Sequence, residues 1–517
     1  MRQVRSYLRD SWVSGQEPST PLYDAGTGEL FAQTSTRGLD LAAALAHSRA
    51  VGGPALRKMT FAERGDLLRQ WSEILHGARD ELIELARMNS GNTRSDAKFD
   101  IDGASGTLAF YASLGKKLGD RTWLLDGPTE PILRSSRFVG QHLLLPRGGV
   151  AIHINAFNFP AWGLAEKAAV AILAGMPVFA KPATSTAAVT ARIVELWAEA
   201  GAIPSGVLSL LSGSAGDLLE HVGALDAIAF TGSGDTGRMI RGHHRVLEWN
   251  VPVNVEADSL NAAILGPDVE PGSDTFQMFV SDVAKDMTQK AGQKCTAIRR
   301  ILVPVDLVDA ATEALVDRLS QAVIGDPDAR ATTVGPLATA SQQRDILAGI
   351  RELSQSAKLV WRAEAVPEKG YFVAPHLFRT DDGLSATFVN DREVFGPVAT
   401  ILTWSGAASE AVDLLARGGG GLVSSLYTDD VDFAREVLLG AAGWHGRLVW
   451  GSKKIADQSF GPGTVLPGFV HGGPGKAGGG EELGGERGMR FYMHRTAIQG
   501  DRALLERAFG GLGTAQS

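Results

Sequence analysis

The segment AGQKCTAIRR, residues 291–300, contains Cys295, the only cysteine among 517 residues. A thiol becomes a good nucleophile when it is accessible and its pKa is lowered, as happens beside cations. Lys290 and Lys294 are neighbours in sequence, although their side chains can point elsewhere. A single cysteine is more often buried and inert, so the segment alone leaves two interpretations open: a nucleophile or a filler of the core.

A glycine-rich turn at residues 230–237, FTGSGDTG, has the pattern of a phosphate-binding loop. Gly232, Gly234 and Gly237 give G-x-G-x-x-G between a strand-like run and a possible helix. Glycine lets the backbone approach a pyrophosphate, and a helix start offers free N–H groups. The same rule expects a ribose-binding acid about 20 positions later, where Glu256 stands. A plain glycine turn is the alternative.

Two further segments carry side chains that suit ligand binding or catalysis. Lys181 ends the strand-like run PVFAK, and such a lysine points from the carboxyl edge of a sheet, where these folds bind ligands. Asn158 stands in NAFNFP after another strand-like run, and an amide N–H can stabilise an oxyanion. A solvated strand end and a turn asparagine are the alternatives, so neither signal is specific alone.

The hydrophobic pattern supplies elements that would position these residues. Residues 38–88 have apolar positions at helical spacing. From about residue 149, the strand-like runs GVAIHINA, PVFAK, VLSLLSG and LDAIAF alternate with helical segments that end at Gly175 and Gly201. This alternation predicts a parallel sheet with helices on both faces. A less regular alternation after residue 260 predicts a second α/β domain.

A glycine-rich stretch covers residues 461–488 and permits two interpretations. Such composition is typical of a flexible linker. However, His471, Glu481, Glu482 and Glu486 interrupt the glycines, and the strand-like run RFYMHRTAIQ follows. We therefore expect an ordered loop near a ligand.

Composition limits the class of protein. Hydrophobic residues make up 44% and charged residues 21%, which is ordinary for a globular enzyme. A net charge of -8 and a pI of about 5.8 argue against nucleic acid and anionic membranes as partners. One cysteine cannot form an internal disulfide, which fits a reducing compartment. The N-terminal residues lack the apolar core of a signal peptide, and no run is long enough to span a membrane, so a cytoplasmic location is expected.

Taken together, six motifs give a specific resemblance. FNFP, KPAT, FTGS, an acid near position 256, GQKC and EVFGPV occur in the order and spacing of the aldehyde dehydrogenase superfamily, and the chain resembles that family over nearly its whole length. The resemblance implies an α/β fold with a variant Rossmann cofactor domain, an α/β catalytic domain and a small oligomerisation segment that forms a homodimer. The implied ranges are 1–128 and 149–258 for the NADP-binding domain, 259–488 for the catalytic domain, and 129–148 with 489–500 for oligomerisation.

The resemblance also implies roles for single residues and no metal. Cys295 matches the nucleophile, and Asn158 with the Cys295 N–H matches the oxyanion hole. Glu256 matches the general base, in place of the ribose contact that the glycine rule suggests. A possible second carboxylate or proton relay involves Lys167, beside Glu166, with the choice between two later glutamates, Glu482 and Glu486, left open. The implied cofactor contacts are Lys181, Thr184, Gly232, Ser233, Glu393 and Phe395.

Departures from the family pattern bear on the cofactor. The family motif around the base is E-L-G-G-K, and here it is EADSL, which keeps the glutamate. The family motif K-P-S/A-E places a glutamate on the adenosine ribose, and here that position is Thr184. A carboxylate repels a 2′-phosphate, whereas a hydroxyl can donate to it. The sequence therefore predicts NADP in preference to NAD.

Longer segments narrow the resemblance. INAFNFP, EADSLN, AGQKCTAIRR, HGGPGKAGGGEELGG and YMHRTAIQG resemble the family branch that oxidises coenzyme A-linked semialdehydes after aromatic ring opening. The implied substrate is of the 3-oxo-5,6-dehydrosuberyl-CoA semialdehyde type (phenylacetate degradation) or 3,4-dehydroadipyl-CoA semialdehyde (benzoate degradation), oxidised to the carboxylate through a Cys295 thioester. Some members carry a hydratase domain; this chain ends soon after TAIQG, so a separately encoded hydratase is expected. The alternatives are a general aliphatic or aromatic aldehyde dehydrogenase, a CoA-acylating dehydrogenase and a catalytically silent relative.

Overall fold

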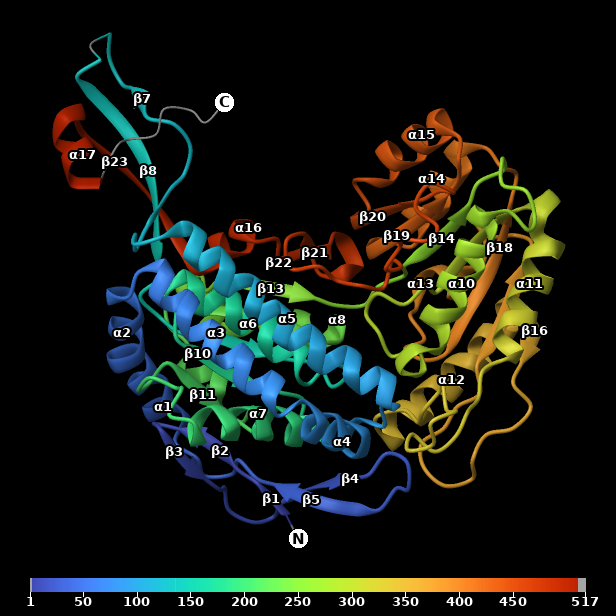
Figure 1. Ribbon diagram of the computed structural model, residues 1–517, viewed down its shortest axis with the longest axis horizontal. Coiled ribbons are helices and arrows are strands. Elements are labelled where there is room, and N and C mark those ends of the chain that lie inside the picture. Colours follow the sequence, from blue (N-terminus) through green and yellow to red (C-terminus); the bar gives the residue numbers. More distant parts are fainter. Residues whose placement is uncertain (1, 135, 510–517) are drawn as a thin grey trace.

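Two α/β lobes lie side by side in the computed structural model, which describes residues 2–134 and 136–509 (Figure 1). The sheet of the first lobe has the order β13-β12-β9-β10-β11-β2-β3. Its central strands run parallel, and β2 and β3 are antiparallel at one edge. The bounds are β2 (Ser6–Leu8), β3 (Ser11–Val13), β9 (Ala151–Ile154), β10 (Val178–Lys181), β11 (Leu208–Leu210), β12 (Ala227–Thr231) and β13 (Val253–Glu256).

Helices pack against this sheet. Thr60 and Glu63 form a reciprocal capping box that starts α3 (Phe61–Gly77), and Gly175 in the left-handed conformation ends α6 (Trp162–Ala174). The other helices of this lobe are α1 (Leu41–His47), α2 (Gly53–Lys58), α4 (Arg79–Ser90), α5 (Arg94–Leu118), α7 (Ala187–Glu199), α8 (Gly234–Arg241) and α9 (His244–Trp249).

Sequence analysis did not anticipate the long helix α5. Its segment contains Gly103 and Gly106, and glycine lowers helix propensity. The structure gives Gly103 a packing role, because a Cβ there would lie 2.2 Å from the Trp162 ring of α6. The close approach of two helices therefore requires a residue that local propensity disfavours.

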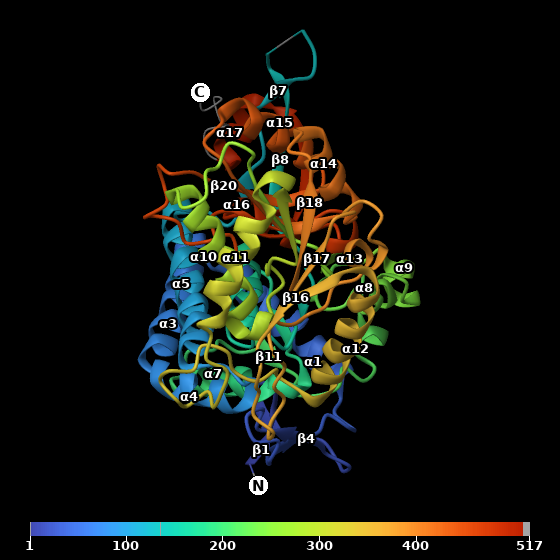
Figure 2. The same ribbon diagram turned by 90° about the vertical axis from the view of Figure 1, so that its right-hand side faces the viewer.

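The sheet of the second lobe has the order β16-β17-β18-β15-β14-β19-β20 and is parallel except for β16 at its edge. Side chains on the two faces form two separate cores: α10 and α11 pack on one face, and α12, α14 and α15 on the other (Figure 2). The bounds are β14 (Ala262–Leu265), β15 (Arg300–Pro304), β16 (Lys358–Arg362), β17 (His376–Thr380), β18 (Val398–Trp404), β19 (Gly421–Tyr427), β20 (His445–Gly451), α10 (Asp274–Thr288), α11 (Val308–Ser320), α12 (Ala340–Ser356), α13 (Thr387–Asp391), α14 (Ala408–Arg417) and α15 (Val431–Ala441).

A projecting arm joins two segments that are far apart in sequence. β8 (Phe138–Pro146) pairs antiparallel with β23 (Met493–Asp501), and the short strands β6 (Leu124–Leu125) and β7 (Glu130–Pro131) flank β8 (Figure 1). The arm coincides closely with the segments predicted for oligomerisation. A further small sheet at the N-terminus contains β1 (Arg2–Val4), β5 (Leu30–Thr34) and β4 (Thr20–Tyr23), and α17 (Arg502–Phe509) follows β23.

The glycine-rich stretch is ordered, as the second interpretation of its sequence predicted. β21 (Val470–Gly473) and β22 (Gly480–Leu483) form an antiparallel hairpin between the lobes, followed by α16 (Glu486–Met489) (Figure 1). We call residues 470–483 the glycine hairpin. Its backbone lies directly on neighbouring strands: a Cβ on Gly446 of β20 would lie 1.7 Å from the Gly472 oxygen. Glycine here permits backbone contact rather than flexibility.

Within residues 2–134 and 136–509, no helix is both long and apolar enough to cross a membrane.

Candidate active site

A cavity of about 500 Å³, partly open to solvent, lies where the first sheet, the loop after α10 and the glycine hairpin meet. Its wall is largely apolar, with Phe99 from α5, Phe159, and Trp162 from α6. Polar side chains gather on another part of the lining. They include Asn158, Glu166, Lys167, Glu256, Cys295 and His471.

Cys295 lies partly exposed in the cavity, on a loop with unusual backbone geometry. Lys290, Ala291 and Gly292 have φ values of 53°, 49° and 68°, in the left-handed region that side chains disfavour. A Cβ on Gly292 would lie 2.2 Å from the Gly396 oxygen, so only glycine fits. Strained backbone of this kind is typical of functional sites, where the surrounding structure holds it in place.

The two lysines near Cys295 in sequence make buried contacts with other side chains. Lys290 Nζ donates to Asn92 Oδ1 at 3.0 Å and lies 4.5 Å from the centre of the Phe159 ring. Lys294 is fully buried, pairs with Asp286 and donates to Gln289 Oε1 at 2.9 Å. Both ammonium groups are therefore engaged elsewhere, and neither is the neighbouring cation that would lower the pKa of the Cys295 thiol.

Two asparagines hold the loop around Cys295, residues 289–299, which we call the cysteine loop. Asn158 Nδ2 donates to the Gln293 oxygen at 3.0 Å, which places this amide beside the loop and in the same cavity as Cys295. Asn261 Nδ2 donates to the Cys295 oxygen at 2.7 Å and to the Ala297 oxygen at 3.0 Å. Asn261 is the last residue of EADSLN, but sequence analysis assigned it no role, because its position 34 residues before the cysteine does not reveal this contact.

A histidine contacts both the thiol and the carboxylate. His471 Nε2 lies 3.8 Å from Cys295 Sγ and 3.3 Å from Glu256 Oε1. Burial raises the pKa of the Cys295 thiol well above its ordinary value, and the Glu256 charge raises it further. Burial also opposes ionisation of Glu256, but the His471 and Lys167 charges outweigh it and lower the Glu256 pKa to about 2. Sequence analysis noted His471 only as an interruption of the glycines.

A buried ion network lies behind Glu256. Lys167 Nζ is 3.0 Å from both Glu166 Oε1 and Glu482 Oε2. Burial raises the pKa of Glu482 to about 7, although the Lys167 charge opposes this rise. Glu486, the other glutamate considered from sequence, is exposed at the start of α16 and lies outside this network. The left-handed turn at Gly484 and Gly485 separates the two positions.

Four predicted cofactor residues lie at one edge of the first sheet. Lys181 ends β10, and Thr184 starts the short 3-10 helix after it. Gly232 and Ser233 follow β12, and Ser233 caps α8 by accepting from the Thr236 N–H at 3.4 Å. β10 and β12 both flank β9, so these residues share its carboxyl edge, where such sheets bind ligands. Burial lowers the pKa of Lys181 to about 8.

At the same edge, the turn at Gly232 would let a ligand approach the protein backbone closely. A Cβ on Gly232 would lie 2.5 Å from the Phe230 ring, so the turn accepts only glycine. The Gly234 N–H at the start of α8 is partly satisfied by Asp258 Oδ1, at 3.1 Å. Asp258 belongs to EADSL, the segment where this sequence departs from the family motif.

Glu393 and Phe395, the residues predicted to contact the nicotinamide end of the cofactor, both contact other side chains of the protein. Glu393 Oε1 is 3.1 Å from Arg299 Nε, and Glu393 Oε2 accepts from the Ser259 N–H at 3.0 Å. Burial raises the pKa of Glu393 to about 7, against the Arg299 charge. The Arg299 guanidinium also lies 5.3 Å from the centre of the Phe395 ring. Sequence analysis missed Arg299, which ties the cysteine loop to this segment by donating to the Gly292 oxygen at 2.9 Å.

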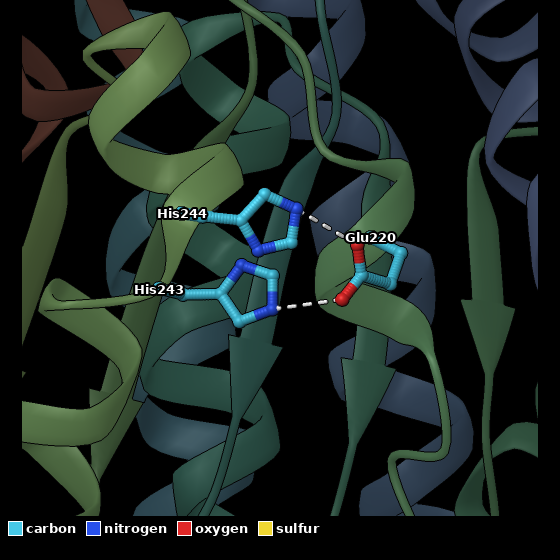
Figure 3. A group of neighbouring side chains, drawn as sticks. All are labelled: Glu220, His243 and His244. Atoms are coloured by element: carbon cyan, nitrogen blue, oxygen red, sulfur yellow. Dashed lines mark ion pairs between the residues drawn. The ribbon is translucent and has the colours of Figure 1, made fainter.

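A separate cluster of metal-binding residue types lies outside the cavity lining. Glu220 Oε1 and Oε2 are 3.3 Å and 3.1 Å from the Nε2 atoms of His243 and His244 (Figure 3). His243 Nδ1 accepts from the Arg245 N–H at 3.3 Å, so a neutral His243 carries its proton on Nε2. A protonated nitrogen cannot bind a metal, and we therefore interpret the cluster as hydrogen-bonded ion pairs.

Comparison with known proteins identifies the family. The model of the aldehyde dehydrogenase family matches residues 12–498, so the chain belongs to this family. The chain is 42% identical over 479 residues to the 3,4-dehydroadipyl-CoA semialdehyde dehydrogenase of Aromatoleum evansii, covering 91% of this chain and 93% of the relative. It is 29% identical to the hydroxyisobutyraldehyde dehydrogenase of Mycolicibacterium austroafricanum, covering 92% and 90%.

Solved structures confirm the predicted fold class. A putative aldehyde dehydrogenase from Burkholderia cenocepacia superposes with a TM-score of 0.84 at 24% identity, covering 100% of both chains. The structure of PnpE in complex with nicotinamide adenine dinucleotide has a TM-score of 0.83 at 25% identity, covering 97% of this chain and 98% of that one. The predicted domain limits and residue roles are not tested by these similarities and stay predictions.

Proposed function

We propose that this protein oxidises a coenzyme A-linked semialdehyde from aromatic ring cleavage, 3,4-dehydroadipyl-CoA semialdehyde or a close analogue, to the carboxylate with NADP. The observation that carries the proposal is the cavity itself, which brings Cys295, Asn158 and Glu256 together. The identity to the Aromatoleum evansii enzyme, whose name states that substrate, supports the acyl-CoA class.

The chain's own side chains would perform the following chemistry. Cys295 Sγ attacks the aldehyde carbon, and the Asn158 amide with the Cys295 N–H stabilises the oxyanion. A bound nicotinamide cofactor supplies a hydride acceptor. Glu256, ionised because its pKa is low, orients and deprotonates the water that hydrolyses the Cys295 thioester. Hydrolysis by water, rather than transfer to coenzyme A, is favoured by this carboxylate in the cavity.

The residues at the sheet edge fit a dinucleotide. Lys181 would contact the adenosine ribose, Gly232 and Ser233 the pyrophosphate, and Glu393 with Phe395 the nicotinamide end. The glycine-only turn at Gly232 and the cation at the end of β10 are the structural features that support this fit. Thr184, which follows Lys181 closely in sequence, offers a hydroxyl in place of a carboxylate to a 2′-phosphate, which supports NADP.

The cavity also suits the acyl part of the substrate. Its aromatic wall suits an acyl chain with an aldehyde end, and the opening to solvent leaves the coenzyme A nucleotide at the surface. Both molecules of a homodimer would carry such a cavity.

The direct test supplies purified protein with 3,4-dehydroadipyl-CoA semialdehyde and either NADP or NAD. We expect NADPH formation, an intact CoA thioester and a new carboxylate at the former aldehyde carbon by mass spectrometry. Cys295→Ala should show no turnover. A free aliphatic aldehyde that is oxidised as efficiently as the CoA-linked one would contradict the proposed substrate, and a second CoA thioester in the product would indicate acylation of coenzyme A instead.

A further inference from the structure

We propose that His471 is a catalytic residue, the immediate proton acceptor of the Cys295 thiol, so that the nucleophile works as a cysteine–histidine pair braced by Glu256. The inference deepens the proposed function and rests on it for the role of Cys295. It concerns a residue of the glycine hairpin for which sequence analysis assigned no function.

The hairpin register aims His471 at the reacting sulfur. His471 of β21 and Glu482 of β22 are direct partners across the antiparallel pair. Side chains of directly opposed residues lie on the same face, so both point toward Glu256 at the end of β13. There His471 Nε2 lies 3.8 Å from Cys295 Sγ and 3.3 Å from Glu256 Oε1.

The contacts of the imidazole ring argue against a purely structural role. Within the described residues, His471 Nδ1 is buried without a hydrogen-bond partner, so the ring makes its polar contacts through Nε2. A histidine retained for stability would be expected to satisfy both ring nitrogens, because an unpartnered buried polar atom costs about 1–3 kcal/mol. The single nitrogen that is engaged faces the thiol and the carboxylate.

The other groups near the sulfur are poorly suited to accept its proton. Lys290 and Lys294 bind Asn92 and Asp286. A carboxylate oxygen of Glu256 also lies within 4.8 Å of Cys295 Sγ, but the charges of His471 and Lys167 lower its pKa despite its burial, which makes it the weaker acceptor for the thiol proton. A carboxylate acting alone beside the thiol would also oppose thiolate formation by like-charge repulsion. An imidazole that contacts both groups accepts the proton and places a positive charge beside two negative ones.

The charged and titratable groups that face His471 come from five elements. They are Glu256 from β13, Cys295 from the loop after α10, Glu166 and Lys167 from α6, Arg447 from β20 and Glu482 from β22.

The step balances as a proton transfer followed by addition. The reacting ring is neutral, with its proton on Nδ1 and a free lone pair on Nε2. The proton of Cys295 Sγ–H moves to His471 Nε2, which gives a thiolate and an imidazolium whose new Nε2–H faces Glu256 Oε1, 3.3 Å away. A lone pair of Sγ then forms the C–S bond to the aldehyde carbon, and the π electrons of the carbonyl group move to its oxygen. The imidazolium stays paired with the Glu256 carboxylate until a proton leaves through solvent.

Alkylation of Cys295 by iodoacetamide tests this without substrate or cofactor, because the chain has no other cysteine. We would measure the alkylation rate from pH 5 to pH 10 in the wild type and in His471→Gln. Glutamine keeps a polar side chain at this position but cannot take a proton. We expect the rate of His471→Gln at neutral pH to fall roughly tenfold or more and its inflection to move to higher pH, since the thiolate is the reacting form.

The matched control is Glu481→Gln, an exposed position on the same hairpin, which should leave the curve unchanged. A wild-type curve in His471→Gln, together with slow alkylation in Glu256→Gln, would overturn the inference and make Glu256 the acceptor. If His471→Gln does not fold, His471→Asn takes its place under the same criterion. Failure of the wild type to oxidise any semialdehyde, with the alkylation result as expected, would reject the proposed function and keep the cysteine–histidine pair.

Discussion

We propose that one side chain, Thr184, sets the preference for NADP. It starts the 3-10 helix after β10, close in sequence to Lys181 at the end of that strand. Thr184→Glu should raise the KM for NADP about tenfold or more and lower the KM for NAD, because a carboxylate repels a 2′-phosphate. Thr184→Gln is the uncharged control. Steady-state kinetics with both cofactors measure the change, and an unchanged ratio would show that Thr184 does not face the ribose.

Glu482 gives the site a pH dependence. Burial raises its pKa to about 7, so it loses its proton as the pH rises through neutrality. Only the ionised form can receive the proton that Glu256 takes from the catalytic water, and kcat should therefore rise with pH across this range. Glu482→Gln should lower kcat and remove this inflection from the profile. Glu486→Gln, at the exposed position, should leave the profile as in the wild type.

Residue spacing could predict part of the site. Asn158, Glu256 and Cys295 each stand in a short motif. The order of these motifs along the chain gave the resemblance to aldehyde dehydrogenases, which predicts that the three residues form one active site. His471 lies 176 residues from Cys295 in a glycine-rich stretch, and no periodicity connects the two. Arg299 and Asn261 were missed for the same reason, since their hydrogen bonds to the cysteine loop depend on how two strands meet.

At the scale of elements, the glycine hairpin depends on backbone contact with β20. Gly446→Ala should destabilise the protein by roughly 1–3 kcal/mol, because its Cβ would lie 1.7 Å from the Gly472 oxygen and would push the hairpin away. Activity should fall as well, since His471 and Glu482 move with the hairpin. Gly443→Ala is the matched control, with no atom within 4 Å of its Cβ. Thermal unfolding would compare the two, and equal midpoints would contradict this packing argument.

The elements themselves were only partly predictable. Strand and helix alternation in residues 149–231 follows from local hydrophobic patterns, and the structure has the predicted parallel strands there. α5 was missed because Gly103 makes sense only against Trp162, a contact between distant segments. The strained turn at Lys290 and Ala291 was equally hidden, because ordinary side chains there give no local sign of a left-handed backbone.

At the scale of the whole molecule, the arm of β8 and β23 is the surface that we propose for the homodimer. Phe138, Leu145 and Leu133 expose apolar side chains along or beside it, with Leu133 64% exposed. Leu133→Glu combined with Leu145→Glu should shift the protein toward monomer without unfolding either lobe. Mass photometry measures the change, with Leu225→Glu, an exposed leucine outside the arm, as control. An unchanged mass distribution would exclude this surface.

The proposed thioester on Cys295 should accumulate in a variant that slows its hydrolysis. Glu256→Gln would be mixed rapidly with NADP and 3,4-dehydroadipyl-CoA semialdehyde while reduced cofactor absorbance is followed, and the quenched protein would be digested and weighed. We predict a burst of NADPH of about one equivalent per active site and an acyl group on Cys295, because hydride transfer precedes the hydrolysis that this variant slows. NADPH formation without a burst and with unmodified Cys295 would contradict the thioester mechanism.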